Sequence, residues 1–162
     1  MDSKHIKEVT IKAAVITVSS TRDNVSDSSG ALIRDLLTQA GIRISHYAVI
    51  PDQIPLIREE FFTALKKANC IIFNGGTGLT HDDCTIEAIT PLLEKRMDGF
   101  GEIFRQLSLE QVGTAAILSR AVAGVTTGKA IFCIPGSNGA VTLATSELII
   151  PQIRHIITHA MR

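Results

Sequence analysis

The sequence has no tryptophan and a single tyrosine, so it lacks the aromatic platforms on which single-stranded nucleic acids stack. Basic and acidic residues balance at 16 each, which argues against a basic nucleic-acid-binding surface and against a polybasic membrane patch. No apolar stretch approaches the roughly 20 residues that a membrane helix needs, and the polar segment 1–12 has no signal-peptide core. We therefore expect a cytoplasmic protein without nucleic-acid or membrane partners.

Cysteine is also scarce, and its placement excludes the common cysteine-based sites. Cys70, Cys84 and Cys133 are odd in number and show no CxxC or other metal spacing. Cys70 and Cys133 lie inside apolar runs, so we interpret them as buried thiols of a protein in a reducing compartment. The net charge of zero gives little protection against self-association, which permits a homo-oligomer.

The residues that are abundant are those of a well-packed core. Hydrophobic residues make up 45% of the 162 positions and charged residues 20%, which predicts a folded chain. The length suits one compact domain over 1–162, and no repeat or linker divides it. We expect 1–10 to form a flexible or subunit-contacting arm.

Short apolar runs alternate along the chain with segments whose apolar residues recur at helical spacing. The runs predict strands over 13–18, 42–50, 70–74 and 130–134. The periodic segments predict helices over 28–41, 53–67, 85–95, 101–109 and 140–161. We expect Pro91 to kink or stop the third of these helices and Pro151 to divide the last. The segment 115–125 is ambiguous and compatible with a strand.

This alternation predicts an α/β fold, in which a mostly parallel sheet is covered by helices on both faces. Ligands of such open sheets bind at the carboxyl ends of the strands. The rule points to the loops 19–27, 74–83 and 135–139, and to Pro51-Asp52 after the second strand.

The loop after the third predicted strand reads NGGTG, over 74–78. Glycines let backbone amides approach a ligand closely, and such amides followed by a helix suit a phosphate. A P-loop would need a lysine that this loop lacks, and a dinucleotide fingerprint would need glycine where His81 stands. The pattern indicates a phosphate loop of another kind, with a plain tight turn as the alternative.

Carboxylates near this loop suggest a metal ion. Asp82 and Asp83 follow the glycines, and Asp52 ends a neighbouring predicted strand. Mg²⁺ commonly takes one or two carboxylates together with phosphate oxygens and water. The alternatives are that Asp82 or Asp83 caps the next helix and that Asp52 belongs to an ordinary turn. The residues alone predict a phosphate-binding α/β domain with a candidate Mg²⁺ site.

Taken together, several stretches resemble a family of molybdenum cofactor biosynthesis proteins that includes bacterial MoaB and MogA and the G domain of gephyrin. The similarity covers nearly the whole chain in the family's order, and the wording GGTGLT, SRAVAG and PGS is closest to the MoaB branch. The matching stretches are AAVITVSSTRD, DSSG, VIPD, NGGTGLTHDDCTIEA, DGFGEIFRQLSLEQVGTAAILSRAVAG and IFCIPGSNGAV.

The resemblance implies a three-layer α/β/α fold that assembles as a homotrimer or as a hexamer of two trimers. It implies adenylylation of molybdopterin with Mg²⁺ and ATP, release of pyrophosphate, and transfer of the product to a MoeA-type metal-insertion protein. Asp52 and Asp83 would be the catalytic acids and hold Mg²⁺. The implied substrate and nucleotide residues are Asp27, Gly30, Gly75, Gly76, Thr77, Gly78, Pro135, Gly136 and Ser137.

Some positions are left open. Ser19, at the end of the first predicted strand, contacts the ligand or forms a local turn. His81 and Asp82 stand where active relatives often have basic residues, and the lack of a cation there would weaken phosphate binding. The alternative to the enzyme is a non-catalytic molybdopterin carrier, which loss of either catalytic acid would indicate. Both acids are nevertheless kept, which favours the enzyme. His155 and His159 are interpreted as a packed or exposed pair, because no third metal ligand is evident. The sequence does not assign roles to Glu102 or Arg120.

Overall fold

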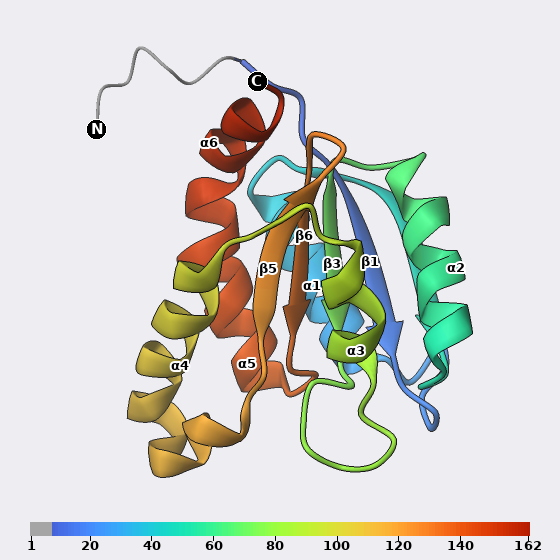
Figure 1. Ribbon diagram of the computed structural model, residues 1–162, viewed down its shortest axis with the longest axis vertical. Coiled ribbons are helices and arrows are strands. Elements are labelled where there is room, and N and C mark those ends of the chain that lie inside the picture. The colour runs from blue at the N-terminus through green and yellow to red at the C-terminus, as the bar shows by residue number, and fades with distance from the viewer. Residues whose placement is uncertain (1–7) are drawn as a thin grey trace.

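The computed structural model describes residues 8–162, and a six-stranded sheet in the order β2-β1-β3-β6-β5-β4 forms its centre (Figure 1). The strands are β1 (Lys12–Val18), β2 (Arg43–Ile50), β3 (Cys70–Asn74), β4 (Lys95–Arg96), β5 (Val122–Thr126) and β6 (Lys129–Ile134). Strands β2, β1, β3 and β6 are parallel, whereas β5 is antiparallel to β6 and β4 is antiparallel to β5. The sheet is mostly parallel, as predicted.

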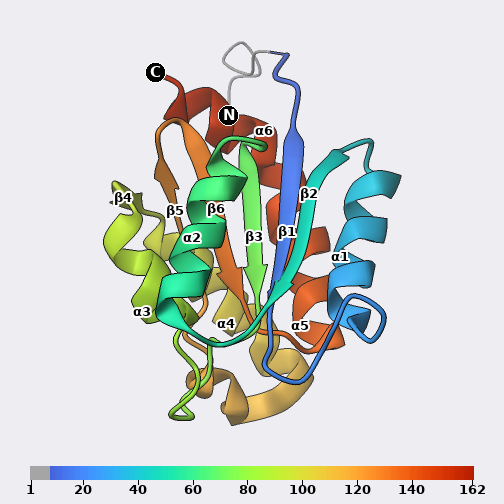
Figure 2. The same ribbon diagram turned by 90° about the vertical axis from the view of Figure 1, so that its right-hand side faces the viewer.

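Helices cover both faces of this sheet (Figure 2). One face carries α1 (Ser28–Gln39), α4 (Asp98–Val112), α5 (Asn138–Leu143) and α6 (Ile150–Ala160). The other face carries α2 (Ile54–Leu65) and α3 (Thr85–Ile89). Every residue of β3 is buried, because a central strand of a doubly covered sheet touches helices on both sides. The predicted three-layer α/β/α architecture is confirmed.

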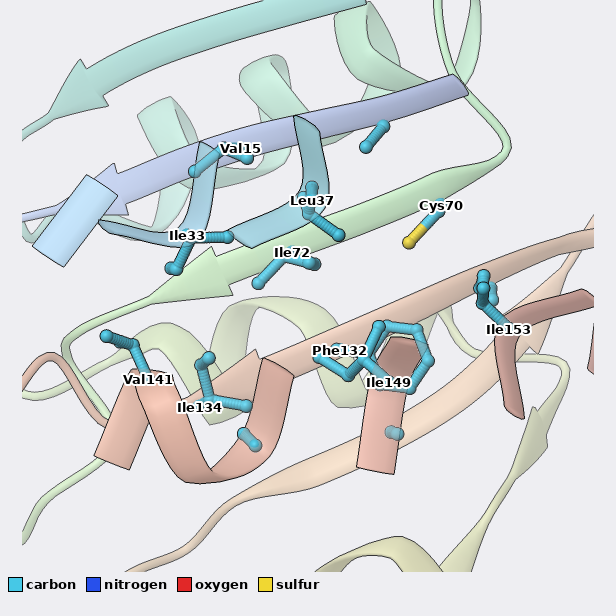
Figure 3. Packing of buried hydrophobic residues seen from close by; sticks show 14 of the residues in the cluster. Val15, Ile33, Leu37, Cys70, Ile72, Phe132, Ile134, Val141, Ile149 and Ile153 are labelled. Atoms are coloured by element: carbon cyan, nitrogen blue, oxygen red, sulfur yellow. The ribbon is translucent and has the colours of Figure 1, made fainter. Parts of the chain in front are cut away.

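The larger core lies between the sheet and the helices of the first face. Figure 3 shows Ile33 and Leu37 of α1 beside Val15 and Ile72 of the sheet. All four side chains are fully buried, and each contributes about 1.5–3 kcal/mol relative to an exposed position. The packing of this layer makes the parallel strands a rigid support for the loops that follow their carboxyl ends.

The middle of the chain differs from the prediction. The helix expected over 85–95 ends at Ile89, continues as the 3-10 helix Thr90–Leu92, and gives way to β4. Pro91 lacks the backbone N–H that a longer α-helix would need, so the expected stop is confirmed. The helix expected over 101–109 is longer, because α4 starts at Asp98 and ends only before Gly113, whose φ is 64°.

The ambiguous segment 115–125 contains most of the 3-10 helix Gly113–Leu118 and the start of β5. At the C-terminal end, the predicted division of the last helix lies upstream of Pro151, in the π-helical turn Ala144–Ile149. Proline cannot donate to the carbonyl one turn earlier, and a wider turn accommodates its ring.

The expected arm over 1–10 falls mostly on residues 1–7, which lie outside the described residues. Within the described part, the side-chain amide of Asn69 donates to the carbonyl of Thr10 at 2.9 Å. Over residues 8–162, no helix is long and apolar enough to cross a membrane.

Candidate functional site

The carboxyl ends of the parallel strands meet at one edge of the sheet, at the bottom of Figure 1. Thr17 of β1 pairs in register with Asn74 of β3, and Asn74 pairs with Ile134 of β6. On the other side, Val18 of β1 pairs with Ile50 of β2. The four loops selected from the sequence therefore start side by side.

A buried polar network connects the ends of β1 and β3 to the start of α1, beneath these loops. The side-chain amide of Asn74 donates to Thr17 Oγ1 at 2.9 Å and accepts from Ser29 Oγ at 2.9 Å. Thr17 Oγ1 in turn donates to Asp27 Oδ2 at 2.6 Å. Asn74 and Ser29 have no exposed surface. Because a broken partner would leave a buried polar group unsatisfied, this network fixes the relative positions of β1, β3 and α1.

Asp27 is the N-cap of α1 and is 2% exposed. Its Oδ1 accepts from the amide of Gly30 at 3.0 Å, and its Oδ2 accepts from the hydroxyl of Tyr47 at 2.6 Å. Burial alone raises the pKa of this carboxyl, but the hydrogen bonds from Thr17, Tyr47, Gly30 and Ser29 outweigh burial and leave the pKa below its ordinary value.

A β-carbon at position 30 would lie 2.0 Å from Asp27 Oδ2, so this contact requires a glycine. Asp27 and Gly30 thus hold the loop 19–27 through internal contacts. Their implied contact with a ligand stays a prediction.

The glycine loop takes a left-handed backbone shape between β1, β6 and α3. Gly75 and Gly76 have φ values of 97° and 68°, which side-chain-bearing residues rarely adopt. The amide of Gly75 donates to the carbonyl of Ile134 at 2.9 Å, and Thr85 Oγ1 donates to the carbonyl of Gly75 at 2.8 Å. The amide of Thr85 donates to the carbonyl of Gly76 at 3.1 Å. The backbone shape alone explains these two glycines.

Each of the two predicted acids lies against one glycine of this loop. Asp52 Oδ1 is 3.1 Å from the place of a β-carbon on Gly76, and Asp83 Oδ2 is 2.7 Å from that place on Gly78. Ser20 Oγ donates to Asp52 Oδ2 at 2.8 Å and accepts from the Asp52 amide at 3.1 Å. The structure therefore brings Asp52 and Asp83 to the same short segment.

Asp83 does not cap α3. The cap position is Cys84, which makes no side-chain capping bond. Instead, Asp83 Oδ2 accepts from the amide of Thr80 at 3.0 Å and from Thr80 Oγ1 at 2.8 Å. Asp82 is exposed. The alternative in which either acid is the helix cap is wrong.

The charge of the site favours a divalent cation. Burial raises the pKa of the Cys84 thiol, and the negative charges of the Asp52, Glu87, Asp83 and Asp82 carboxylates raise this pKa further. Four acidic side chains therefore lie near one thiol. Among residues 8–162, no three side chains of histidine, cysteine, aspartate or glutamate are grouped to hold a metal ion. Two carboxylates whose cation takes its other ligands from phosphate and water fit Mg²⁺.

A pocket of about 300 Å³ opens beside the loop. It is lined by Gly76, Thr77, Gly78, Asp83, Leu118, Ser119, Pro135 and Gly136. Gly136 belongs to the loop after β6, and a β-carbon there would be 3.3 Å from Gly75 Cα. Sequence reasoning missed Leu118 and Ser119, because the segment before β5 has no periodic pattern.

Two predicted serines make local contacts. Ser19 Oγ accepts from the amide of Arg22 at 3.1 Å, and Ser137 Oγ accepts from the amide of Ala140 at 3.2 Å as the N-cap of α5. The local-turn alternative for Ser19 is therefore confirmed, and ligand contact by either serine stays a prediction.

A larger hollow of about 670 Å³ lies at the opposite edge of the sheet, between β4, β5 and α6. His155 and His159 belong to it, with their Nε2 atoms 3.0 Å apart. No predicted catalytic or substrate-binding residue lines this hollow. Its size alone does not make it the site, because the glycine loop and both acids are elsewhere.

The fold and site together define an α/β domain with a mostly parallel sheet, whose glycine loop and two carboxylates lie at the strand ends, where such sheets bind their ligands. The comparisons with known proteins narrow this class. Residues 14–155 match the family model described as probable molybdopterin binding domain. The chain belongs to this family.

Several of its relatives carry the name molybdenum cofactor biosynthesis protein B. The relative from Halalkalibacterium halodurans is 46% identical over 164 residues, covering 98% of this chain and 96% of that protein. The relative from Staphylococcus aureus is 49% identical over 152 residues, covering 91% and 90%.

Solved structures agree with this assignment. A crystal structure of molybdenum cofactor biosynthesis protein B has a TM-score of 0.91 at 38% identity, covering 95% of this chain and 98% of the other. The tungsten cofactor synthesizing protein MoaB from Pyrococcus furiosus has a TM-score of 0.87 at 36% identity, covering 96% and 100%. A MogA structure has a TM-score of 0.83 at 28% identity, covering 92% and 99%.

Proposed function

We propose that the protein acts in molybdenum cofactor biosynthesis as a molybdopterin adenylyltransferase. One observation carries this proposal: Asp52 and Asp83 approach Gly76 and Gly78 of the same loop, beside a pocket at the strand ends. The names of the relatives support the pathway. The substrates are molybdopterin and ATP, and the products are adenylyl-molybdopterin and pyrophosphate.

The transfer forms a bond between the terminal phosphate oxygen of molybdopterin and the α-phosphorus of ATP, while the bond to pyrophosphate breaks. The backbone of the loop Gly75–Gly78 binds the triphosphate, and the pocket beside Pro135 and Gly136 receives the pterin substrate. No covalent enzyme intermediate is needed, because positioning and charge stabilisation suffice for such a displacement.

Asp52 and Asp83 would hold Mg²⁺, which neutralises phosphate charge in the transition state. Both carboxylates are oriented before any ligand binds. Ser20 holds one oxygen of Asp52, and Thr80 holds one oxygen of Asp83 through two hydrogen bonds. Each acid keeps its other oxygen for the metal ion, and this pre-orientation limits the ordering cost of binding.

The direct test mixes the purified protein with molybdopterin, ATP and Mg²⁺ and follows the mass of adenylyl-molybdopterin. Product from the wild-type protein and none from Asp52→Ala or Asp83→Ala supports the proposal. Molybdopterin binding without any product overturns the enzyme and leaves a carrier of the same pathway. Asp82→Ala is the matched control, because this neighbouring acid is exposed and lies outside the pocket lining.

A further inference from the structure

Arg120 comes from a distant part of the chain, just before β5, and reaches across to the glycine loop. Its backbone amide donates to the carbonyl of Thr77 at 3.3 Å. Its Nε donates to the carbonyl of Gly78 at 3.0 Å, and its Nη2 donates to the carbonyl of Asp83 at 3.4 Å. One residue thus contacts both ends of the segment 77–83, which carries the glycines and the acid.

The third nitrogen of the guanidinium is also engaged. Its Nη1 donates to Glu87 Oε1 of α3 in an ion pair. The hydrogen bond from Arg120 is the main reason that the pKa of Glu87 lies below its ordinary value. Glu87 therefore orients the guanidinium, and the planar fork then donates to the carbonyls of Gly78 and Asp83 at once.

These contacts determine where the loop amides point. A peptide unit is planar and trans, so its N–H is directed opposite to its C=O. The bonds to the carbonyls of Thr77 and Gly78 direct these oxygens toward Arg120, and the amides of Gly78 and Leu79 consequently point away from it. The bond to the carbonyl of Asp83 fixes the backbone from which the predicted metal-binding carboxylate extends.

We propose that Arg120 is a positioning residue, which holds the segment 77–83 in its phosphate-binding shape through the guanidinium fork. This role rests on the proposed function of the same site. It differs from direct contact with substrate phosphate, because three of the five guanidinium N–H groups, one on each nitrogen, donate to protein acceptors. The segment before Asp83 contains no lysine or arginine, so Arg120 also brings a positive charge to the loop from elsewhere in the fold.

Arg120→Lys separates the positioning role of Arg120 from the effect of its positive charge, because lysine keeps the charge and loses the guanidinium fork. The first readout is hydrogen exchange of the amides in 77–83, measured on the ligand-free protein. We expect faster exchange in Arg120→Lys and wild-type exchange in Glu87→Gln, which keeps an oxygen acceptor for Nη1. Arg96→Lys is the matched control, because Arg96 pairs with Asp98 outside the loop.

The second readout is kinetic. Loss of a residue that orients a metal ligand typically costs about 10–100-fold, and we expect this loss in kcat/KM for Arg120→Lys. Both a higher KM for ATP and a lower kcat should contribute, because the phosphate loop and Asp83 move together. A merely structural role would lower the active fraction and leave the KM unchanged.

The outcomes separate this inference from the proposed function. Wild-type exchange and wild-type kinetics in Arg120→Lys overturn the positioning role and leave only a charge effect. If the wild-type protein makes no product, the adenylyltransferase proposal fails, and the exchange rates still decide on Arg120. If Arg120→Lys does not fold, Glu87→Ala replaces it: faster exchange in 77–83 supports the role of the oriented guanidinium, and unchanged exchange overturns it.

Discussion

Gly78 and Asp83 approach each other so closely that a β-carbon at position 78 would lie 2.7 Å from Asp83 Oδ2. Atoms this close repel, and the carboxylate is the end of a movable side chain, so Gly78→Ala should displace Asp83 from Thr80. The backbone at Gly78 is not in the left-handed region, and the fold should persist. We expect kcat/KM for adenylylation to fall about 10–100-fold, as for loss of a group that orients a metal ligand.

Gly99→Ala is the matched control for this substitution. Gly99 lies in the first turn of α4, and no atom lies within 4 Å of the place of its β-carbon. Alanine is favoured over glycine in a helix, so this variant should keep full activity and unfold no earlier than the wild-type protein. Equal activity of Gly78→Ala and wild type would show that the close approach has no catalytic consequence.

The two acids should matter through their charge. Asp83→Asn and Asp52→Asn keep the size of the side chain and remove the anionic oxygen that Mg²⁺ prefers. Metal-ion charge stabilisation is worth several kcal/mol, and each 1.36 kcal/mol is tenfold in rate. We expect pyrophosphate release to fall about 10²–10³-fold, with a thermal midpoint close to that of the wild-type protein.

The dependence on Mg²⁺ concentration gives the sharper comparison. The residual activity of either variant should require more Mg²⁺ for half-saturation, whereas Asp82→Asn should follow the wild-type curve, because Asp82 is exposed. Normal turnover by Asp83→Asn at low Mg²⁺ would remove this residue from the metal site.

The parallel half of the fold could be predicted because its strands are buried on both faces. Runs such as CIIFN must be apolar throughout to lie in such a sheet, so their pattern is unambiguous. The antiparallel half was harder. Strand β4 has only two residues, and β5 joins β6 through a two-residue turn at Thr127 and Gly128, both with positive φ. Such short elements carry little periodicity.

The candidate site likewise has residues that the sequence predicts and residues that it does not. The glycine loop and its acids are close in sequence, and the rule for strand ends brought Asp52 to them. Arg120 is 37 residues from Asp83, and its contacts with the loop are with backbone carbonyls, which leave no trace in the side-chain pattern. The internal role of Asp27 was hidden for a related reason: Asp27 caps α1, whereas its partner Tyr47 lies on β2, 20 residues further along the chain.

We expect the predicted homotrimer or hexamer to assemble through exposed apolar side chains of α4 and the following 3-10 helix. Five large apolar side chains are about half or more exposed there: Ile103 at 48%, Leu109 at 51%, Val112 at 56%, Ile117 at 78% and Leu118 at 52%. Burial of such a surface drives association. Ile117→Asp should therefore reduce the mass of the particle in solution, measured by light scattering after size exclusion.

Val25→Asp is the control for this experiment. Val25 is 95% exposed in the loop 19–27, away from α4, and its replacement should leave the particle mass unchanged. A monomeric wild-type protein would contradict the oligomer itself. An unchanged mass for Ile117→Asp in an oligomeric protein would place the interface on another surface.

Asp27 should make the protein sensitive to acid. Its pKa in the folded protein lies below the ordinary value of 3.8, because the hydrogen bonds to the carboxylate outweigh the effect of burial. A lowered folded-state pKa stabilises the fold at pH values above the unfolded-state pKa, and this stabilisation is lost as the pH falls through the folded-state value. The loss should therefore begin near pH 4 and continue below it.

Asp27→Asn should remove this contribution. Near pH 7 we expect the free energy of unfolding to fall by about 1–3 kcal/mol, because the amide group of asparagine faces donors that have lost their anionic acceptor. Below pH 4 the variant and the wild-type protein should converge. Urea unfolding between pH 7 and pH 3 measures both effects, with Asp35→Asn on the exposed side of α1 as the control. Parallel curves for Asp27→Asn and wild type over this range would mean that Asp27 titrates alike in the folded and unfolded chains, and that its hydrogen bonds only offset its burial.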